Sequence, residues 1–175
     1  MDLEFDFCAP ATSDAAALAA IVSNGKALVI RSFDPEKPDR KPLWKFPGGR
    51  VEWQRGESVY DALLREIPEE TGFVIPHLKL RGGKLIVGNS NVKVSHLSSS
   101  EIPSKDKPHT QHRFIVEVGN ELDILYLDRQ TRKEDDIETI ESRVFSMDEL
   151  LILPDFLWWQ FEFRAEVQAY LSKPA

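Results

Sequence analysis

The sequence predicts a single mixed α/β domain, in which a hairpin-rich sheet is covered by a few helices. Three observations support this fold class. The 175 residues are enough for one well-buried core and too few for two comfortable domains. Hydrophobic residues make up 42% and charged residues 29% of the chain, which is typical of globular proteins and not of disordered ones. Many segments show the pattern of strands, several of them beside turn signals, and a few show helical periodicity.

A β-hairpin is predicted near the start of the chain. The apolar runs AALAAIV and KALVIRSF, within residues 15–33, flank Asn24-Gly25, a dipeptide that tolerates the positive φ angles of a tight hairpin turn. The other strands predicted by this reasoning are HLKL and KLIVG around Arg81-Gly82-Gly83, HRFIVEV at 112–118, DILYLD at 123–128 and SRVFS at 142–146. Residues 34–42 hold three prolines, and residues 95–111 are polar, so both segments are predicted to be loops.

Three helical segments are predicted from periodicity and from their ends. Between Ser58 and Thr71, apolar residues recur at three- and four-residue steps, with Ser58 suited to cap the first turn and Gly72 to end the helix. Ser146-x-x-Glu149 resembles a capping box before a short helix. Residues 154–172 are predicted to form a C-terminal helix, while the first ten residues or so are expected to be flexible.

Charge and cysteine content exclude several classes of protein. A net charge of −7 predicts weak non-specific attraction to nucleic acid, so a polyanionic substrate needs local basic side chains or metal ions. Because Cys8 is the single cysteine, an intramolecular disulfide and a thiolate metal cluster are excluded, and a cytoplasmic location is expected. The Ala-rich run at 15–22 is too short for a membrane span and lacks the basic start of a signal peptide, so no membrane association is expected.

The stretch REIPEETG, residues 65–72, concentrates negative charge on one side of the main predicted helix. At 100° per residue, Glu69 lies about 60° to one side of Glu66 and Glu70 about 40° to the other. Carboxylates within such an arc repel one another. Two interpretations follow: the three glutamates form an ordinary solvated face, or a cation binds among them.

The longer stretch PGGRVEWQRGESVYDALLREIPEETGF, residues 47–73, resembles the Nudix box, whose pattern is G-x5-E-x7-R-E-U-x-E-E-x-G-U with U an apolar residue. From Glu57 onward the match is complete through Arg65-Glu66, Glu69-Glu70, Gly72 and Phe73. The match begins at Gly49 and is interrupted once. Seven residues, not five, separate Gly49 from Glu57, and we interpret the difference as a two-residue insertion at Trp53-Gln54-Arg55.

A second departure from a regular motif is Pro68, which lies inside the predicted helix. Proline removes one helical hydrogen bond and presses against the carbonyl of Leu64, at a cost of about 3 kcal/mol or more in a regular helix. A kink at Pro68, between Glu66 and Glu69, would change the geometry of the carboxylates.

The resemblance implies a metal site and assigns roles to its residues. By matching positions, Glu66 and Glu70 coordinate Mg²⁺ or Mn²⁺, Glu69 coordinates or supports the ion, and the carbonyl of Gly48 is a further ligand. Glu57 pairs with Arg65 or orients the ligands, and Arg65 holds carboxylates in place. These hard cations prefer carboxylate, carbonyl and water oxygens. The general base stays open between Glu66 and a residue outside the box, Glu138 or Glu141 in KEDDIETIES.

The resemblance also implies a fold and a function. The fold is a Nudix-type α/β/α sandwich with a mixed β-sheet. The function is hydrolysis, dependent on a divalent metal, of the pyrophosphate in a nucleoside diphosphate linked to another moiety, with a small nucleotide-type molecule as substrate. The alternative is a catalytically inactive binding protein for a ligand or partner. A nucleic-acid enzyme such as a cap hydrolase is disfavoured by the −7 charge.

Several side chains outside the motif carry weaker predictions. Arg31, Lys45, Arg50 and Arg55 are candidate phosphate contacts, although for any one of them a surface charge is the favoured interpretation. Trp44 and Trp53 could stack on a nucleobase or belong to the core. The aromatic residues of the final helix, Trp158, Trp159, Phe161 and Phe163, are predicted to pack on the sheet or in a homodimer interface.

Overall fold

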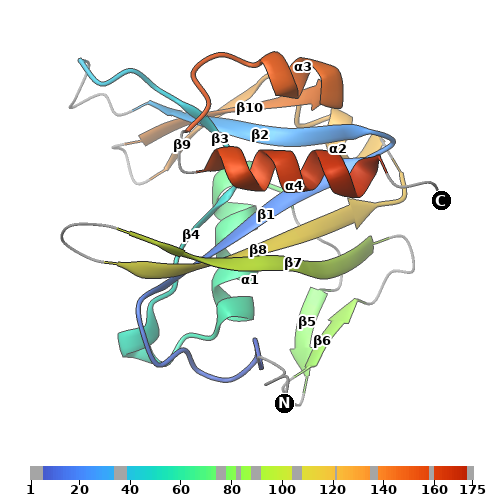
Figure 1. Ribbon diagram of the computed structural model, residues 1–175. Helices are drawn as coiled ribbons and strands as arrows, with labels where there is room; N and C mark the ends of the chain where they lie inside the picture. The colour runs from blue at the N-terminus through green and yellow to red at the C-terminus, as the bar shows by residue number, and fades with distance from the viewer. Residues whose placement is uncertain are drawn as a thin grey trace.

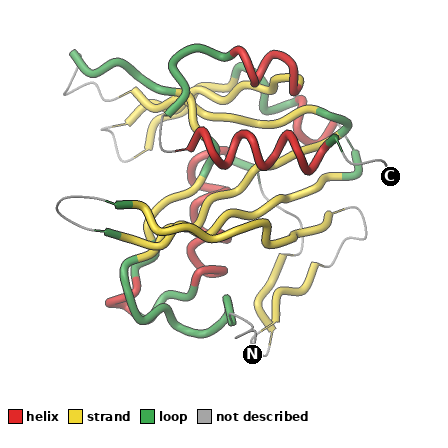
Figure 2. The backbone as a smooth tube through the Cα atoms, viewed as in Figure 1, coloured by secondary structure: helices red, strands yellow, loops and turns green. Residues whose placement is uncertain are grey.

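A mixed sheet forms the middle layer of the molecule, with helices on both of its faces. The computed structural model describes residues 6–33, 39–73, 78–81, 84–87, 92–103, 108–120, 122–134, 138–157 and 160–172. Helix α1 (Val59–Thr71) lies behind the sheet and helix α4 (Phe161–Leu171) in front of it in Figure 1. Figure 2 shows the same three layers, with helices in red on either side of the yellow strands. The predicted α/β/α sandwich is therefore confirmed.

The sheet brings together segments from most of the chain. Within the described residues, its strands are β1 (Ala15–Ser23), β2 (Lys26–Phe33), β3 (Trp44–Lys45), β4 (Gly48–Arg50), β7 (Val92–Ile102), β8 (His109–Val118), β9 (Gln130–Glu134) and β10 (Glu138–Ser146). The main strand order is β7-β8-β1-β2-β10-β9, with β3 paired to β2 and β4 paired to β1. Strands β1 and β8 run parallel, whereas the other pairs in this sheet are antiparallel. The sheet is thus mixed.

The predicted hairpin is present and turns at the predicted dipeptide. Ser23 pairs with Lys26 across the turn, and Asn24 and Gly25 have φ angles of 47° and 72°. Two successive positive φ angles define a turn whose twist matches that of the paired strands. The described parts of the predicted strands HLKL and KLIVG lie in β5 (Leu78–Arg81) and β6 (Lys84–Val87), which form a separate two-stranded sheet.

Strand β1 lies at the centre of the core and is covered on both faces. Ala17, Ala19 and Ile21 belong to the apolar cluster on the α1 side. Leu18, Ala20 and Val22 belong to the cluster on the α4 side. Because both faces are buried, β1 is a continuous apolar run and does not alternate with polar residues.

Helix α1 begins and ends as the sequence predicts. Ser58 accepts a hydrogen bond from the Asp61 backbone N–H, and the Asp61 side chain accepts one from the Ser58 N–H, so that a capping box opens the helix. Gly72 ends it in the left-handed conformation, with a φ of 65°. Another capping box, Ser146 with Glu149, opens α3 (Met147–Ile152), as predicted.

The polar segment 95–111 is mostly strand, and the prediction of a loop there is wrong. Strand β7 continues to Ile102 and pairs with β8 along its length, interrupted by an irregularity between His96 and Ser98. β8 in turn begins at His109. A polar edge strand lacks the alternation of apolar and polar residues by which strands are predicted. It forms because its backbone pairs with a strand that is distant in sequence.

The predicted strand DILYLD is a helical turn. Residues Leu122–Leu125 form helix α2, and the chain continues in turns to Arg129. Ile124 and Leu127, three residues apart, are both buried in the cluster on the α1 side. A three-residue spacing of buried side chains suits a helical turn and not the two-residue period of a strand.

The C-terminal helix begins later than the predicted residue 154. Asp155 has a φ of 60°, Phe156 forms an isolated bridge with Trp44, and Leu157 N–H donates to the Trp44 carbonyl. These contacts hold residues 154–157 out of a helix, and α4 starts at Phe161. Phe163 is buried against the sheet whereas Phe161 is 47% exposed; Trp158 and Trp159 lie outside the described residues.

The start of the described chain contacts α1. The N–H of Tyr60 donates to the carbonyl of Phe7, whose ring packs against the Tyr60 ring. Residues 1–5 lie outside the described residues. None of the helices in the described part of the chain has the length and hydrophobicity needed to cross a lipid bilayer.

Candidate functional site

The glycine loop before α1 is a short strand whose polar backbone groups face the helix. Gly49 pairs with Ala17 of β1, and the flanking bonds Ala19 N–H to Pro47 C=O and Val51 N–H to Ala15 C=O continue the ladder. In an antiparallel ladder, a residue that lies between two hydrogen-bonded pairs directs its own N–H and C=O away from the partner strand. Gly48 is that residue, so its carbonyl faces away from β1.

Gly48 occupies a position that only glycine fits. Its φ is 135°, and a Cβ there would stand 2.1 Å from the Ala17 carbonyl oxygen. Side chains are excluded at this point by the close approach of two backbones. The next residue, Gly49, faces the carboxylate of Glu66. The two glycines therefore bring the loop backbone into direct contact with the acidic side of α1.

Glu70 is the most deeply buried of the three helix glutamates. It is 6% exposed, and its two carboxylate oxygens accept hydrogen bonds from different partners. Oε1 accepts from Lys45 Nζ at 2.7 Å, and Oε2 accepts from Gly48 N–H at 2.6 Å. Burial raises the pKa of the Glu70 carboxyl, although the Lys45 ammonium acts in the opposite direction. Glu70 thus joins the end of α1 to both sides of the Phe46-Pro47 corner.

Arg65 holds the other acidic side chains together. Its Nε and Nη2 donate to the two oxygens of Glu57 at 2.9 and 3.1 Å. Nη1 donates to Glu66 Oε1 at 2.7 Å and, more weakly, to Glu69 Oε2 at 3.3 Å. Nη2 also donates to the Arg50 carbonyl at 3.0 Å, which ties α1 to the loop. The expected pairing of Glu57 with Arg65 is therefore present in the structure.

The electrostatics of these groups reflect their burial and their pairing. Burial raises the pKa of the Glu66 carboxyl, and the Arg65 guanidinium opposes the shift. Hydrogen bonds from Arg65 to Glu57 raise the pKa of the guanidinium, which is charged at any relevant pH. Site carboxylates are accordingly kept in place by cationic side chains and by backbone N–H groups.

Pro68 does not interrupt the helix. Helix α1 continues to Thr71, and Gly72 N–H donates to the Pro68 carbonyl at 2.8 Å. Glu69 and Glu70 therefore stay on the same helix as Glu66.

The segment interpreted as an insertion forms a compact turn. Trp53–Arg55 is a 3-10 helix, η1, closed by Gly56 with a φ of 77°. Glu52 N–H donates to Glu57 Oε2 at 2.6 Å. The turn therefore begins and ends next to Glu57, the residue that pairs with Arg65. Trp53 packs against the core on the α1 side. A cavity of about 490 Å³ lies along this loop, lined by Asp14 and residues 50–55.

The acidic candidates outside the motif lie elsewhere. Glu141 Oε2 accepts from Arg31 Nη2 at 2.5 Å, and the Arg31 guanidinium lies over the ring of Trp44 at 4.6 Å. Trp44 belongs to the cluster on the α4 side, so the sheet separates Glu141 from α1. Glu138 begins β10, and its side chain lies outside what the structure describes.

The candidate phosphate contacts differ in their surroundings. Arg50 pairs with Asp14 at 2.5 Å and Arg55 with Glu52 at 2.7 Å, both as surface ion pairs. Trp44 is 7% exposed and packs edge-on against Phe145, which makes it a core residue. Lys45 alone of the four basic candidates contacts a glutamate of α1. Sequence reasoning missed this contact because the partners are 25 residues apart and no local pattern joins them.

The groups at this site match the chemistry of a hard divalent cation. Among the described residues, no three or more His, Cys, Asp and Glu side chains stand arranged to hold a metal ion. The potential donors around Gly48 are all oxygens, namely the Glu66 and Glu70 carboxylates and the Gly48 carbonyl, and such donors suit Mg²⁺ or Mn²⁺. The Glu66 and Glu70 carboxylates repel each other, and a cation between them would relieve this repulsion. The donors therefore fit, provided that Glu66 and Glu70 turn from Arg65 and Lys45.

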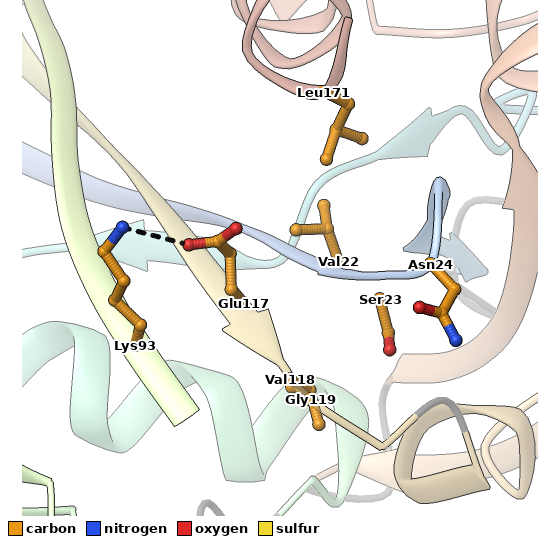
Figure 3. Close-up of a pocket in the computed structure, with 8 residues that line it drawn as sticks. All are labelled: Val22, Ser23, Asn24, Lys93, Glu117, Val118, Gly119 and Leu171. Atoms are coloured by element: carbon orange, nitrogen blue, oxygen red, sulfur yellow. Dashed lines mark ion pairs between the residues drawn. The ribbon is translucent and has the colours of Figure 1, made fainter. Parts of the chain in front are cut away.

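A different cavity lies at the far end of β1. It measures about 380 Å³ and is lined by Val22, Ser23, Asn24, Lys93, Glu117, Val118, Gly119 and Leu171, as Figure 3 shows. Lys93 and Glu117 form an ion pair of 3.4 Å on its wall. The glycine loop pairs with Ala17 and Leu18, several residues earlier in β1, and no α1 residue lines this cavity. It is therefore separate from the acidic site.

Comparison with protein families gives a match over most of the chain. The model of the NUDIX domain matches residues 13–167. Among curated proteins, the putative 8-oxo-dGTP diphosphatase YtkD of Bacillus subtilis (strain 168) is 36% identical over 64 residues, which are 37% of this chain and 39% of that protein. The chain thus spans about two fifths of the length of this relative.

Solved structures share the fold over nearly the whole chain. The Escherichia coli ORF135 protein has a TM-score of 0.60 and 21% identity, covering 93% of this chain and 94% of that one. The NUDIX domain of Shewanella oneidensis NrtR, complexed with ADP ribose, has a TM-score of 0.59 and 13% identity, covering 90% and 88%. At such identities the likeness concerns the fold. From the family match together with the motif and the sandwich, the chain belongs to the NUDIX domain family.

Proposed function

We propose that the protein is a hydrolase, dependent on Mg²⁺ or Mn²⁺, that cleaves the pyrophosphate of a nucleoside diphosphate linked to another moiety. The observation that carries the proposal is that two carboxylates, the buried one of Glu70 and the partly buried one of Glu66, lie against the Gly48-Gly49 backbone. The names of similar proteins support a nucleotide substrate: one relative is called a putative 8-oxo-dGTP diphosphatase, and one similar structure contains ADP ribose.

Glu66 and Glu70 would hold the metal, with Glu69 and the Gly48 carbonyl as further ligands. A bound divalent cation offsets charge on the phosphate oxygens and lowers the pKa of a coordinated water. Arg65 acts as a positioning residue, because its hydrogen bonds fix Glu57 and Glu66 relative to the loop carbonyl of Arg50. Gly48 and Gly49 keep side chains out of the space between loop and helix.

Glu66 is the general base that we propose. Its carboxylate lies against Gly49, whereas Glu141 is ion-paired to Arg31 on the opposite face of the sheet. In the reaction, a water oxygen attacks one phosphorus, the proton passes to the base, and the bridging P–O bond breaks with its electron pair on the leaving phosphate. The products are a nucleoside monophosphate and a phosphorylated second product.

A catalytically inactive binding protein is the second candidate function. It is favoured by the contacts that Arg65 and Lys45 make with the acidic side chains, since these contacts satisfy the carboxylates without a metal. Such a protein would bind a nucleotide ligand and give no turnover.

A hydrolysis screen tests the proposal. The substrates are nucleoside triphosphates, nucleotide sugars, dinucleoside polyphosphates and nucleotide coenzymes, each with Mg²⁺ or Mn²⁺. We expect turnover of at least one class and a loss of about 100-fold or more in Glu66→Gln and Glu70→Gln, as for removal of a group that stabilises the transition state. Glu141→Gln is the matched control and should keep its activity. Absence of turnover in the wild type, or an unaffected Glu70→Gln, contradicts the proposal.

A further inference from the structure

Lys45 and Glu70 form a partly buried ion pair at the proposed metal site. The Glu70 side chain is 8% exposed and the Lys45 side chain 21%, and the two are joined by a contact of 2.7 Å. Lys45 is the second residue of β3, next to Trp44, which points into the core on the α4 side. Side chains alternate along a strand, so the Lys45 side chain is directed to the α1 side.

A carboxylate as buried as Glu70 requires a compensating charge. Removing an ionised group from water is costly unless a partner of opposite charge or several hydrogen bonds replace the lost hydration. Gly48 N–H supplies one hydrogen bond, and the Lys45 ammonium supplies both a hydrogen bond and the opposite charge. Lys45 therefore fills, at Glu70, the electrostatic role that a metal ion would have.

The charge count at the site leaves room for a divalent cation. Four carboxylates, those of Glu57, Glu66, Glu69 and Glu70, contact the cations Arg65 and Lys45. In their ordinary charge states these six side chains carry an excess of two negative charges. One divalent cation balances that excess, and at Glu70 it competes with Lys45 for the same carboxylate.

We propose that Lys45 is a built-in counter-ion that holds Glu70 in the metal-free protein and is displaced from it when a divalent cation binds. The inference rests on the proposed metal site and adds a competition to it. Lys45 and the cation compete for one carboxylate oxygen, so the apparent metal affinity includes the cost of breaking the ion pair. Because the ammonium is a compact charge on a flexible stem, it can leave Glu70 without moving β3.

After its displacement from Glu70, the Lys45 ammonium has a second role, which is to bind the substrate. It stays within one side-chain length of Glu70, beside the place where the substrate pyrophosphate would lie against the metal. A bound substrate brings a further anion, the pyrophosphate, with which the ammonium can pair. Lys45 thereby links metal loading to substrate binding: it stabilises the empty site first and the bound phosphate afterwards.

The first test measures thermal stability without metal. In the presence of EDTA, Lys45→Met should lower the Tm by roughly 5 °C or more, since it leaves Glu70 without its cation. Lys45→Arg, which keeps the charge, should lose less. In the Glu70→Gln background, Lys45→Met should have little further effect. Lys93→Met is the matched control, because Lys93 is also ion-paired but is exposed and lies at the far cavity.

The second test measures metal binding directly, by titration with Mn²⁺ and calorimetry. Lys45→Met should bind Mn²⁺ at least about threefold more tightly than the wild type, because the competitor is gone, and saturating Mn²⁺ should restore most of its lost Tm. With metal-loaded enzyme, Lys45→Met should raise KM for the best substrate of the screen while kcat changes less.

Two results would overturn the inference: an unchanged metal-free Tm in Lys45→Met, or Mn²⁺ binding that is equal to or weaker than that of the wild type. An unchanged KM would contradict the proposed contact of Lys45 with the substrate and would leave its counter-ion role at Glu70 intact. These outcomes are separable from failure of the proposed function. If no substrate turns over but Lys45→Met still tightens Mn²⁺ binding, the counter-ion role stands and the hydrolase proposal fails.

Discussion

Gly49 and Glu66 approach each other so closely that no side chain fits between them. A Cβ built on Gly49 would lie 2.2 Å from Oε1 and 2.4 Å from Cδ of Glu66, well inside any real contact of a Cβ atom. The neighbouring Gly48 is also required, but for a different reason: its Cβ would meet the backbone of Ala17 and its φ is 135°. One glycine thus makes space for a side chain and the other for a backbone.

Because of this difference, we expect one alanine substitution to lower mainly the activity and the other to lower the Tm. Gly49→Ala collides with the end of a flexible side chain, so the Glu66 carboxylate moves aside while the fold survives. We expect a Tm close to that of the wild type and a loss of roughly tenfold or more in hydrolysis, as for other misplaced active-site groups. Gly48→Ala collides with backbone and is strained by about 1–3 kcal/mol or more, so its Tm should fall clearly. Equal Tm values for the two variants would contradict this account.

The pair of Arg65 and Glu57 should behave as one unit. Arg65 donates two hydrogen bonds to Glu57, a geometry that lysine cannot reproduce. We expect Arg65→Lys and Glu57→Gln each to destabilise the metal-free protein, and the double variant to be less destabilised than the sum, with a coupling of about 1 kcal/mol. Denaturant unfolding of the four proteins measures it. Glu69→Gln serves as the comparison, since its 3.3 Å contact is half exposed and should contribute little.

Pro68 should be replaceable. Its position inside a helix that continues without a break means that the Leu64 carbonyl lacks its regular partner. Pro68→Ala supplies the missing N–H, so we expect a higher Tm together with hydrolysis within about twofold of the wild type. A large loss of activity in Pro68→Ala would show instead that the proline sets the direction of Glu69 and Glu70.

Acid should weaken the fold through His112. This residue is 3% exposed, and its Nδ1 lies 2.8 Å from Ser99 Oγ. Burial lowers the pKa of His112 to about 4 from an ordinary value of 6.5. Between these values the unfolded chain binds a proton that the folded protein does not. The free energy of unfolding should therefore fall with pH from about 6.5 to about 4, by up to about 1.4 kcal/mol per pH unit from this group.

The substitution His112→Gln removes the titrating group at that position. Urea unfolding at pH 7.5 and pH 5 measures the effect. The glutamine variant should lose less stability than the wild type between the two pH values, whatever its stability at pH 7.5. If both proteins lose the same amount, another group is responsible for the acid sensitivity.

The elements that sequence reasoning predicted correctly are those specified by neighbouring residues. The Asn24-Gly25 turn, the Ser58 and Ser146 capping boxes and the Gly72 end of α1 depend on hydrogen bonds and φ angles within a few residues. The acidic arc of α1 is likewise local, because helical geometry alone brings Glu66 and Glu70 to one side. These local features are sufficient to locate the candidate site along the chain.

Tertiary contacts determined the elements that depend on partners distant in the sequence. The polar residues 95–102 become strand because β8 pairs with them, and residues 154–157 stay out of the helix because Trp44 holds them. Tertiary structure also decided what surrounds the carboxylates. Lys45 and Glu70 meet because β3 passes the end of α1, and Glu141 is kept from α1 by the thickness of the sheet. Residues close in sequence can specify a turn, a cap or a helix face, but the charge that meets a buried carboxylate depends on how the layers pack.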